Sequence, residues 1–74
     1  MKFLIIGCGS IGRRHIRNLR ELGETDILAF DPAEDRRDLA LRDGTLKVFG
    51  NLDQAIEQRP HAAFVCSPTS FHLE

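Results

Sequence analysis

The chain has 74 residues, of which 42% are hydrophobic and 28% are charged, and its formal net charge is −1. This length allows one domain at most, and the near-neutral charge excludes the overall electrostatic attraction on which nucleic-acid-binding and anionic-membrane-binding proteins depend. No apolar run approaches the ~18 residues of a membrane span and no signal peptide is evident, so we expect a cytoplasmic protein with neither nucleic acid nor membrane as a partner.

The first element is an apolar run, Phe3 to Ile6, which is typical of a strand buried on both faces of a parallel sheet. Gly7, Gly9 and Gly12 follow in the order G-x-G-x-x-G. We expect the first glycine to make a tight turn, the second to let backbone approach a pyrophosphate, and the third to let a helix lie close to the strand. That helix should begin near Ser10, so that its unpaired N–H groups and positive dipole end face the phosphates.

A helix over residues 10–22 is predicted, closed by Gly23 at a position suited to a left-handed cap. Its arginines lie opposite the apolar stripe with no aromatic residues between them, so we interpret them as a solvated face rather than a nucleic-acid surface. His15 is predicted to pack rather than to act as a base, because nothing within a turn could orient it. The apolar stripe is Gly12, Ile16 and Leu19, with Leu22 beside it, and the arginines are Arg13, Arg17 and Arg20.

A second strand, residues 26–30, ends in Asp31, about 20 residues beyond the last glycine, where the dinucleotide fingerprint places an acid that accepts hydrogen bonds from the adenosine ribose. A compatible interpretation is that Asp31 caps the next helix, since Pro32 stands at a natural first helical position. Arg36 lies one turn further on, where a guanidinium could stack on adenine or meet a 2′-phosphate. Because Asp31 would repel that phosphate, we favour NAD over NADP, with NADP left open.

The remaining elements alternate between helix and strand. This alternation predicts an α/β fold, a Rossmann-type doubly wound parallel sheet with right-handed crossovers and the truncated strand order 3-2-1-4. The third helix carries a capping box and an apolar stripe, and a proline ends it. The predicted elements are a helix over 33–42 closed by Gly44, a strand over 46–49, a helix capped by Asn51 and Gln54 with the stripe Leu52, Ala55 and Ile56 and its end at Pro60, and a strand over 62–66.

Strand order reverses between the first and fourth strands, so their carboxyl ends should form the ligand crevice. Ser67, Thr69 and nearby backbone would contact the ribose and nicotinamide half, and His72 could reach the same region. A plain strand-to-helix turn remains an alternative for residues 67–70. Cys8 and Cys66 lack metal-ligand spacing, so we expect small buried fillers at neighbouring strand ends, close enough for an adventitious disulfide.

A methyltransferase would share the glycine-rich turn and the acid after the second strand. Those folds usually have glycine where Ile11 stands and an acid where Ile6 stands. The two positions therefore favour a dinucleotide over a methyl donor.

Together these motifs resemble a family of oxidoreductases, the glucose–fructose oxidoreductase, inositol dehydrogenase and rhizopine-catabolism (Gfo/Idh/MocA) group. The resemblance implies an NAD(P)-dependent dehydrogenase or reductase that transfers hydride to or from a sugar, sugar derivative or polyol. It rests on residues 7–15 with Asn18 and Leu19, on Asp31-Pro32 with Arg36, on Asn51-Leu-Asp53 with Ile56, and on Ser67-Pro-Thr-Ser-Phe-His72. By motif position, Gly7, Gly9, Ser10, Ile11 and Gly12 would hold the pyrophosphate, Asp31 the ribose, Arg36 the adenine, and Ser67, Pro68, Thr69 and His72 the nicotinamide side.

The family's catalytic lysine, in a Glu-Lys-Pro motif on a fifth strand, would come after Glu74, and so would the substrate domain. We therefore expect residues 1–74 to be a partial dinucleotide-binding domain of an oxidoreductase, inactive alone. A stand-alone NAD-binding or redox-sensing module and a structural or interaction domain are the alternatives. Without a fifth strand the edge of strand 62–66 would be unpaired, which predicts a homo-oligomer formed through that edge.

Overall fold

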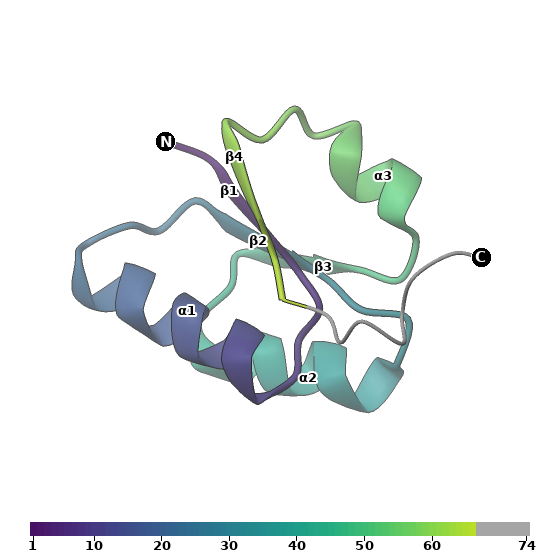
Figure 1. Cartoon of the computed structure of the whole chain (residues 1–74), viewed down its shortest axis with the longest axis horizontal. Helices are drawn as coiled ribbons and strands as arrows, with labels where there is room; N and C mark the ends of the chain where they lie inside the picture. The colour runs from purple at the N-terminus through teal and green to yellow at the C-terminus, as the bar shows by residue number, and fades with distance from the viewer. Residues whose placement is uncertain (67–74) are drawn as a thin grey trace.

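A computed structural model describes residues 1–66 as a four-stranded parallel sheet with helices on both faces (Figure 1). The strand order is β3-β2-β1-β4, which confirms the predicted α/β doubly wound topology. The predicted site positions Ser67, Pro68, Thr69 and His72 lie outside the described residues. The strands are β1 (Phe3–Ile6), β2 (Ile27–Phe30), β3 (Lys47–Phe49) and β4 (Ala62–Val65), and the helices are α1 (Ser10–Glu21), α2 (Glu34–Asp43) and α3 (Leu52–Ile56).

The central strand β1 pairs in parallel with β2 on one side and with β4 on the other. Its last residue, Ile6, stands opposite both Phe30 and Val65. The carboxyl ends of these three strands therefore finish level with one another. The segments that leave them, the turn after β1 and the residue after β2, start at the same edge of the sheet.

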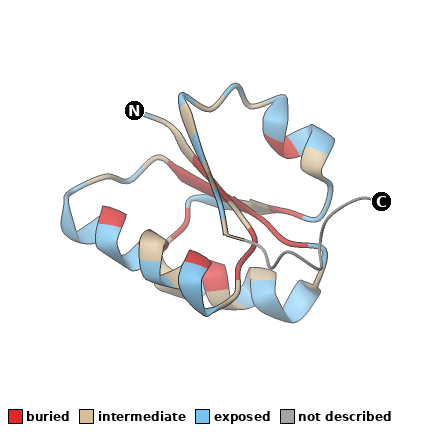
Figure 2. Cartoon of the chain, viewed as in Figure 1, coloured by how far each residue is buried: buried red, intermediate tan, exposed pale blue. Residues whose placement is uncertain are grey.

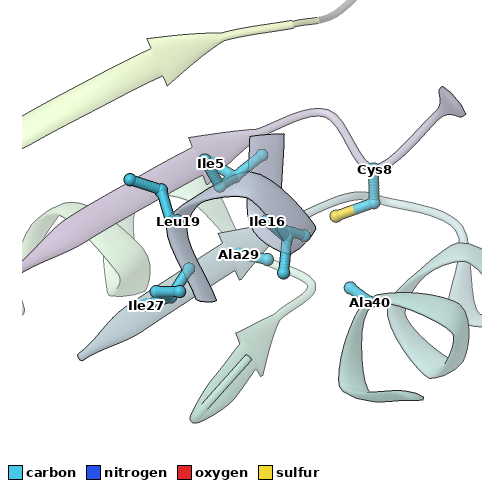
Figure 3. Packing of buried hydrophobic residues seen from close by; sticks show 7 residues of the cluster. All are labelled: Ile5, Cys8, Ile16, Leu19, Ile27, Ala29 and Ala40. Atoms are coloured by element: carbon cyan, nitrogen blue, oxygen red, sulfur yellow. The ribbon is translucent and has the colours of Figure 1, made fainter. Parts of the chain in front are cut away.

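The core has two layers, one on each face of the sheet. On the first face, apolar side chains of β1 and β2 pack against α1 and α2 (Figure 3). On the second face, other side chains of the same strands pack against α3. Figure 2 accordingly shows β2 buried along its length between the layers. The first layer contains Ile5, Ile27 and Ala29 with Ile16, Leu19 and Ala40, and the second contains Leu4, Leu28, Phe30 and Phe49 with Ala55.

Several element ends differ from the sequence prediction. Leu22 is 79% exposed and does not join the stripe of α1, because it is the C-cap residue and Gly23, with φ +92°, turns the chain away. Ile56 is exposed and does not join the predicted apolar stripe of α3; Ala55 is the one buried residue of this five-residue helix. Helix α3 ends at Ile56, four residues before the predicted stop at Pro60. Its predicted N-cap is present, since the Asn51 side chain accepts the Gln54 N–H at 3.1 Å.

The arginine face of α1 is not purely solvated. Arg13 Nε lies 2.6 Å from Asp43 Oδ2, and Arg17 Nη1 lies 3.4 Å from Oδ1 of the same carboxylate. Asp43 is the last residue of α2, so these two ion pairs join the helices that cover one face of the sheet. The mixed charges of α2 gave no indication in the sequence that Asp43 pairs with arginines of α1, which lies far from it in the chain.

Candidate functional site

The turn after β1 is built by two glycines that the fold itself requires. Gly7 has φ +100°, a left-handed conformation that side chains rarely adopt, and its N–H donates to Phe30 O at 2.8 Å. A Cβ on Gly12 would lie 1.9 Å from Gly7 O. The predicted roles of Gly7 in the tight turn and of Gly12 in the close approach of α1 to β1 are therefore confirmed.

Gly9, between them, is different because the described protein does not require a glycine there. Its φ of −77° and ψ of −165° are extended backbone that any residue adopts. A Cβ at Gly9 would have one close neighbour, Arg36 Nη1 at 3.7 Å, which is ordinary van der Waals contact. As far as residues 1–66 are concerned, the missing side chain leaves free space beside the backbone at the carboxyl edge of the sheet.

The start of α1 opens onto the same space. Gly9 is the N-cap residue, and within residues 1–66 no side chain caps the helix start. Ser10 and Ile11, the first helical residues, are exposed, and the first turn carries no acidic residue. The first N–H groups of a helix have no intrahelical acceptor and carry the positive end of its dipole. This end of α1 is thus chemically suited to an anion.

Asp31 closes the site on the β2 side and is held by hydrogen bonds from four directions. Its Oδ2 accepts the Cys8 N–H at 2.8 Å and its Oδ1 accepts the Ala33 N–H at 2.9 Å. Its backbone N–H donates to Phe49 O at 3.2 Å, and its carbonyl accepts Arg37 Nη1 at 2.8 Å. Asp31 is only 4% exposed.

The interpretation that Asp31 caps the next helix is wrong, because Ala33 is the N-cap of α2 and no side chain of the described residues caps it. The bond to Ala33 is a turn two residues ahead, of the type that Asp side chains commonly form before a helix. Helix α2 begins at Glu34 with Ala33 as its N-cap, so Pro32 precedes the helix instead of opening it. The carboxylate therefore fixes the approach to α2 and the turn after β1 together.

The two adjacent arginines of α2 have separate positions. Arg37 turns inward to the Asp31 carbonyl and also lies beside Gly50. Arg36 is exposed, and its guanidinium is the nearest group to the free space at Gly9. The sequence prediction singled out Arg36 and missed Arg37. The signal that Arg37 faces inward was its position three residues before the buried Ala40, which places the two residues on the same face of the helix.

Cys8 lies within the turn as a buried filler, as predicted. It is 1% exposed, and its thiol contacts Phe30 O at 3.5 Å. Burial, and then the Asp31 carboxylate, raise the pKa of the Cys8 thiol from 9.0 to about 12. Burial also raises the pKa of Cys66, which packs against the same core layer, and both thiols are free. Cys8 is therefore a protonated, structural residue at neutral pH.

The structure thus gathers the predicted residues of the described part at one edge of the sheet. They bring together a helix start, a stretch of backbone without side-chain cover and an exposed guanidinium, with the buried Asp31 carboxylate directly behind the turn. This combination suits a ligand that carries both phosphate and hydroxyl groups. The residues are Gly7, Gly9, Ser10, Ile11, Gly12, Asp31 and Arg36.

Comparison with protein-family models matched residues 1–74 to GFO_IDH_MocA, described as an oxidoreductase family with an NAD-binding Rossmann fold. Searches of curated proteins and of solved structures found no match. Among residues 1–66, no helix is long and apolar enough to cross a membrane.

Proposed function

The chain belongs to the Gfo/Idh/MocA oxidoreductase family, whose domain here is the NAD-binding Rossmann fold, and from this membership we propose a binding mode for the dinucleotide. The pyrophosphate lies over residues 7–12, against the start of α1. The adenosine ribose lies at Asp31 and the adenine beneath the Arg36 guanidinium. By family motif, Ser67, Pro68, Thr69 and His72 serve the nicotinamide side.

The space at Gly9 carries this proposal. A glycine lowers stability by entropy wherever the backbone does not need it. At Gly9 neither the φ angle nor a close contact among residues 1–66 needs it. The N-cap position of α1 itself favours glycine over alanine, and a ligand group that approaches the backbone where a Cβ would stand is a further physical reason for it. A pyrophosphate at the open end of α1 is such a group.

Among nicotinamide dinucleotides, we favour NAD over NADP. The Asp31 carboxylate lies at the ribose position and would repel a 2′-phosphate. Arg36 would offset part of this repulsion, since its guanidinium also faces the loop. The buried carboxylate is held by two backbone N–H groups and cannot turn away, whereas the exposed arginine can.

When bound, the dinucleotide supplies hydride transfer, and the residues of this chain supply binding and orientation. We propose that the oxidoreductase of which they form the nucleotide-binding part acts on a sugar, sugar derivative or polyol. This substrate class follows from the family resemblance of the motifs. Its proton-transfer group would be the lysine of the family's Glu-Lys-Pro motif.

Calorimetric titration of the wild type and Gly9→Ala with NAD and NADP tests the site. We expect the wild type to bind NAD more tightly than NADP. Gly9→Ala should stay folded, with a free energy of unfolding within about 1 kcal/mol of the wild type, because the entropy gain and the poorer N-cap oppose each other. It should bind NAD about 10 to 100 times more weakly, because the new methyl group occupies the phosphate position.

Gly23→Ala is the matched control, a glycine-to-alanine change at the far end of α1. Because Gly23 has φ +92°, this variant should lose stability and keep its affinity for NAD. A stable Gly9→Ala protein with unchanged NAD affinity would refute the proposed site. A folded wild type that binds neither dinucleotide would instead favour a structural or interaction domain.

A further inference from the structure

Asp31 has a role in the structure that does not involve ribose. We propose that its carboxylate is a positioning group that holds the phosphate-binding turn in shape, so that nucleotides without ribose hydroxyls depend on it as well. This inference rests on the proposed function. It adds to the ribose contact without replacing it, because a carboxylate oxygen that accepts one hydrogen bond keeps capacity for another.

The first step concerns the backbone of the turn. Cys8 is the residue between Gly7 and Gly9, and its N–H points at Asp31 Oδ2 over 2.8 Å. This bond sets the orientation of the peptide unit that leads from the left-handed Gly7 toward Gly9. If the acceptor were removed, a buried N–H would lose its partner, and the turn would have to reorganise to recover one.

The second step concerns what holds the carboxylate itself. Oδ1 accepts the Ala33 N–H, and the backbone of Asp31 is fixed on both sides by Phe49 O and by Arg37 Nη1. Asp31 thus links the turn after β1 to the end of β2, to β3 and to α2. The carboxylate is a fixed anchor and not a mobile surface group, in keeping with its 4% exposure.

Asp31→Asn separates the two roles, because it keeps the shape but replaces one carboxylate oxygen by an amide NH2 that cannot accept an N–H. We would measure the affinities of ADP and of 2′,3′-dideoxy-ADP, which retains the pyrophosphate and adenine and lacks both ribose hydroxyls. The positioning role predicts that Asp31→Asn weakens dideoxy-ADP about tenfold or more, and that it weakens ADP by at least the same factor because the ribose contact is disturbed as well.

Asp43→Asn is the matched control, since Asp43 is also a largely covered acid, bonded to Arg13 and Arg17 and not to the turn. It should lower the unfolding temperature and leave both affinities unchanged. A purely structural effect of Asp31→Asn would behave in the same way. Titrations are therefore made at a temperature at which every variant is fully folded.

Amide hydrogen exchange of the unliganded wild type gives a second readout that needs no variant. The Cys8 and Ala33 amides should be protected as strongly as amides within β1, and rapid exchange at Cys8 would overturn the inference. In Asp31→Asn, exchange should rise at the Cys8 or Ala33 amide that faces the new NH2 group, whereas a uniform rise over all helices and strands would also overturn it.

The binding outcomes separate the inference from the proposed function. Loss for dideoxy-ADP as well as for ADP supports the positioning role, whether or not ADP loses more. Loss for ADP alone, or for neither ligand, overturns it and leaves the dinucleotide site standing. A folded wild type that binds neither NAD nor ADP overturns the proposed function, and the inference with it.

Discussion

At the scale of single residues, neighbouring positions in the turn after β1 are restricted by different physical constraints. Gly7 is fixed by its backbone conformation, Cys8 by burial, and Gly9 by neither. Asp31 reaches across from β2 to bind the middle one. Substitutions at these adjacent positions should therefore have different effects on the free energy of unfolding and on NAD affinity, depending on whether the backbone conformation, the burial or the ligand contact of the position is changed.

The Cys8 thiol predicts an alkaline loss of stability. The folded state keeps the thiol protonated up to a pKa of about 12, whereas the unfolded chain releases the proton near 9.0. The contribution of the protonated Cys8 thiol to the free energy of unfolding is complete below pH 9. It declines between pH 9 and 12, by about 1.4 kcal/mol per pH unit. Urea unfolding at pH 8, 9 and 10 measures it, and the chain has no tyrosine to titrate in this range.

Cys8→Ala is the control for this titration. It should be less stable than the wild type at pH 8 because it leaves a small cavity, and its stability should fall less steeply above pH 9. Cys66→Ala should keep most of the wild-type slope, because Cys66 is only partly buried. Equal slopes for the wild type and Cys8→Ala would contradict the assignment.

At the scale of elements, the packing of α1 against β1 depends on one missing side chain. Gly12→Ala would place a methyl group 1.9 Å from Gly7 O, and neither backbone can retreat without moving the helix. We expect a loss of about 3 kcal/mol or more in the free energy of unfolding, or failure to fold. Denaturant unfolding measures it, with Ser10→Ala at the exposed start of the same helix as control. A loss below about 1 kcal/mol would show that α1 can shift.

The order of the elements could be predicted from the sequence because each signal was local. Apolar runs, glycine caps and the Asn51 cap mark strand and helix ends, and right-handed crossovers then fix the sheet order. The bonds of Asp31 to Cys8 and of Arg13 to Asp43 could not be predicted, since each joins segments far apart in the chain. Ile56 was misassigned because so short a helix has too few residues to define a face.

At the scale of the whole molecule, the outer strand β4 is more exposed than the central strands β1 and β2. Among the described residues β4 pairs only with β1, and Ala63 and Val65 are exposed, the latter by 74%. An open apolar strand edge is a template for pairing with a second chain. We predict that the protein of residues 1–74 self-associates through β4.

Light scattering over a range of concentrations measures this association. The apparent mass should rise with concentration, and Val65→Lys should reduce the rise by placing a charge beside the edge. Leu22→Lys makes the same charge change at an exposed leucine beyond α1, and it should leave the association unchanged. A monomer at every concentration would contradict the prediction.

The most direct measurement of the central claim is a titration of the isotope-labelled protein with NAD, followed by the backbone amide signals in NMR spectra. Binding at the carboxyl edge predicts shifts concentrated at residues 7–12 and 31–36. Amides at the opposite edge, around Lys2 and His61, should stay in place. Shifts centred on that opposite edge, or no shifts at millimolar NAD, would contradict the proposed dinucleotide site.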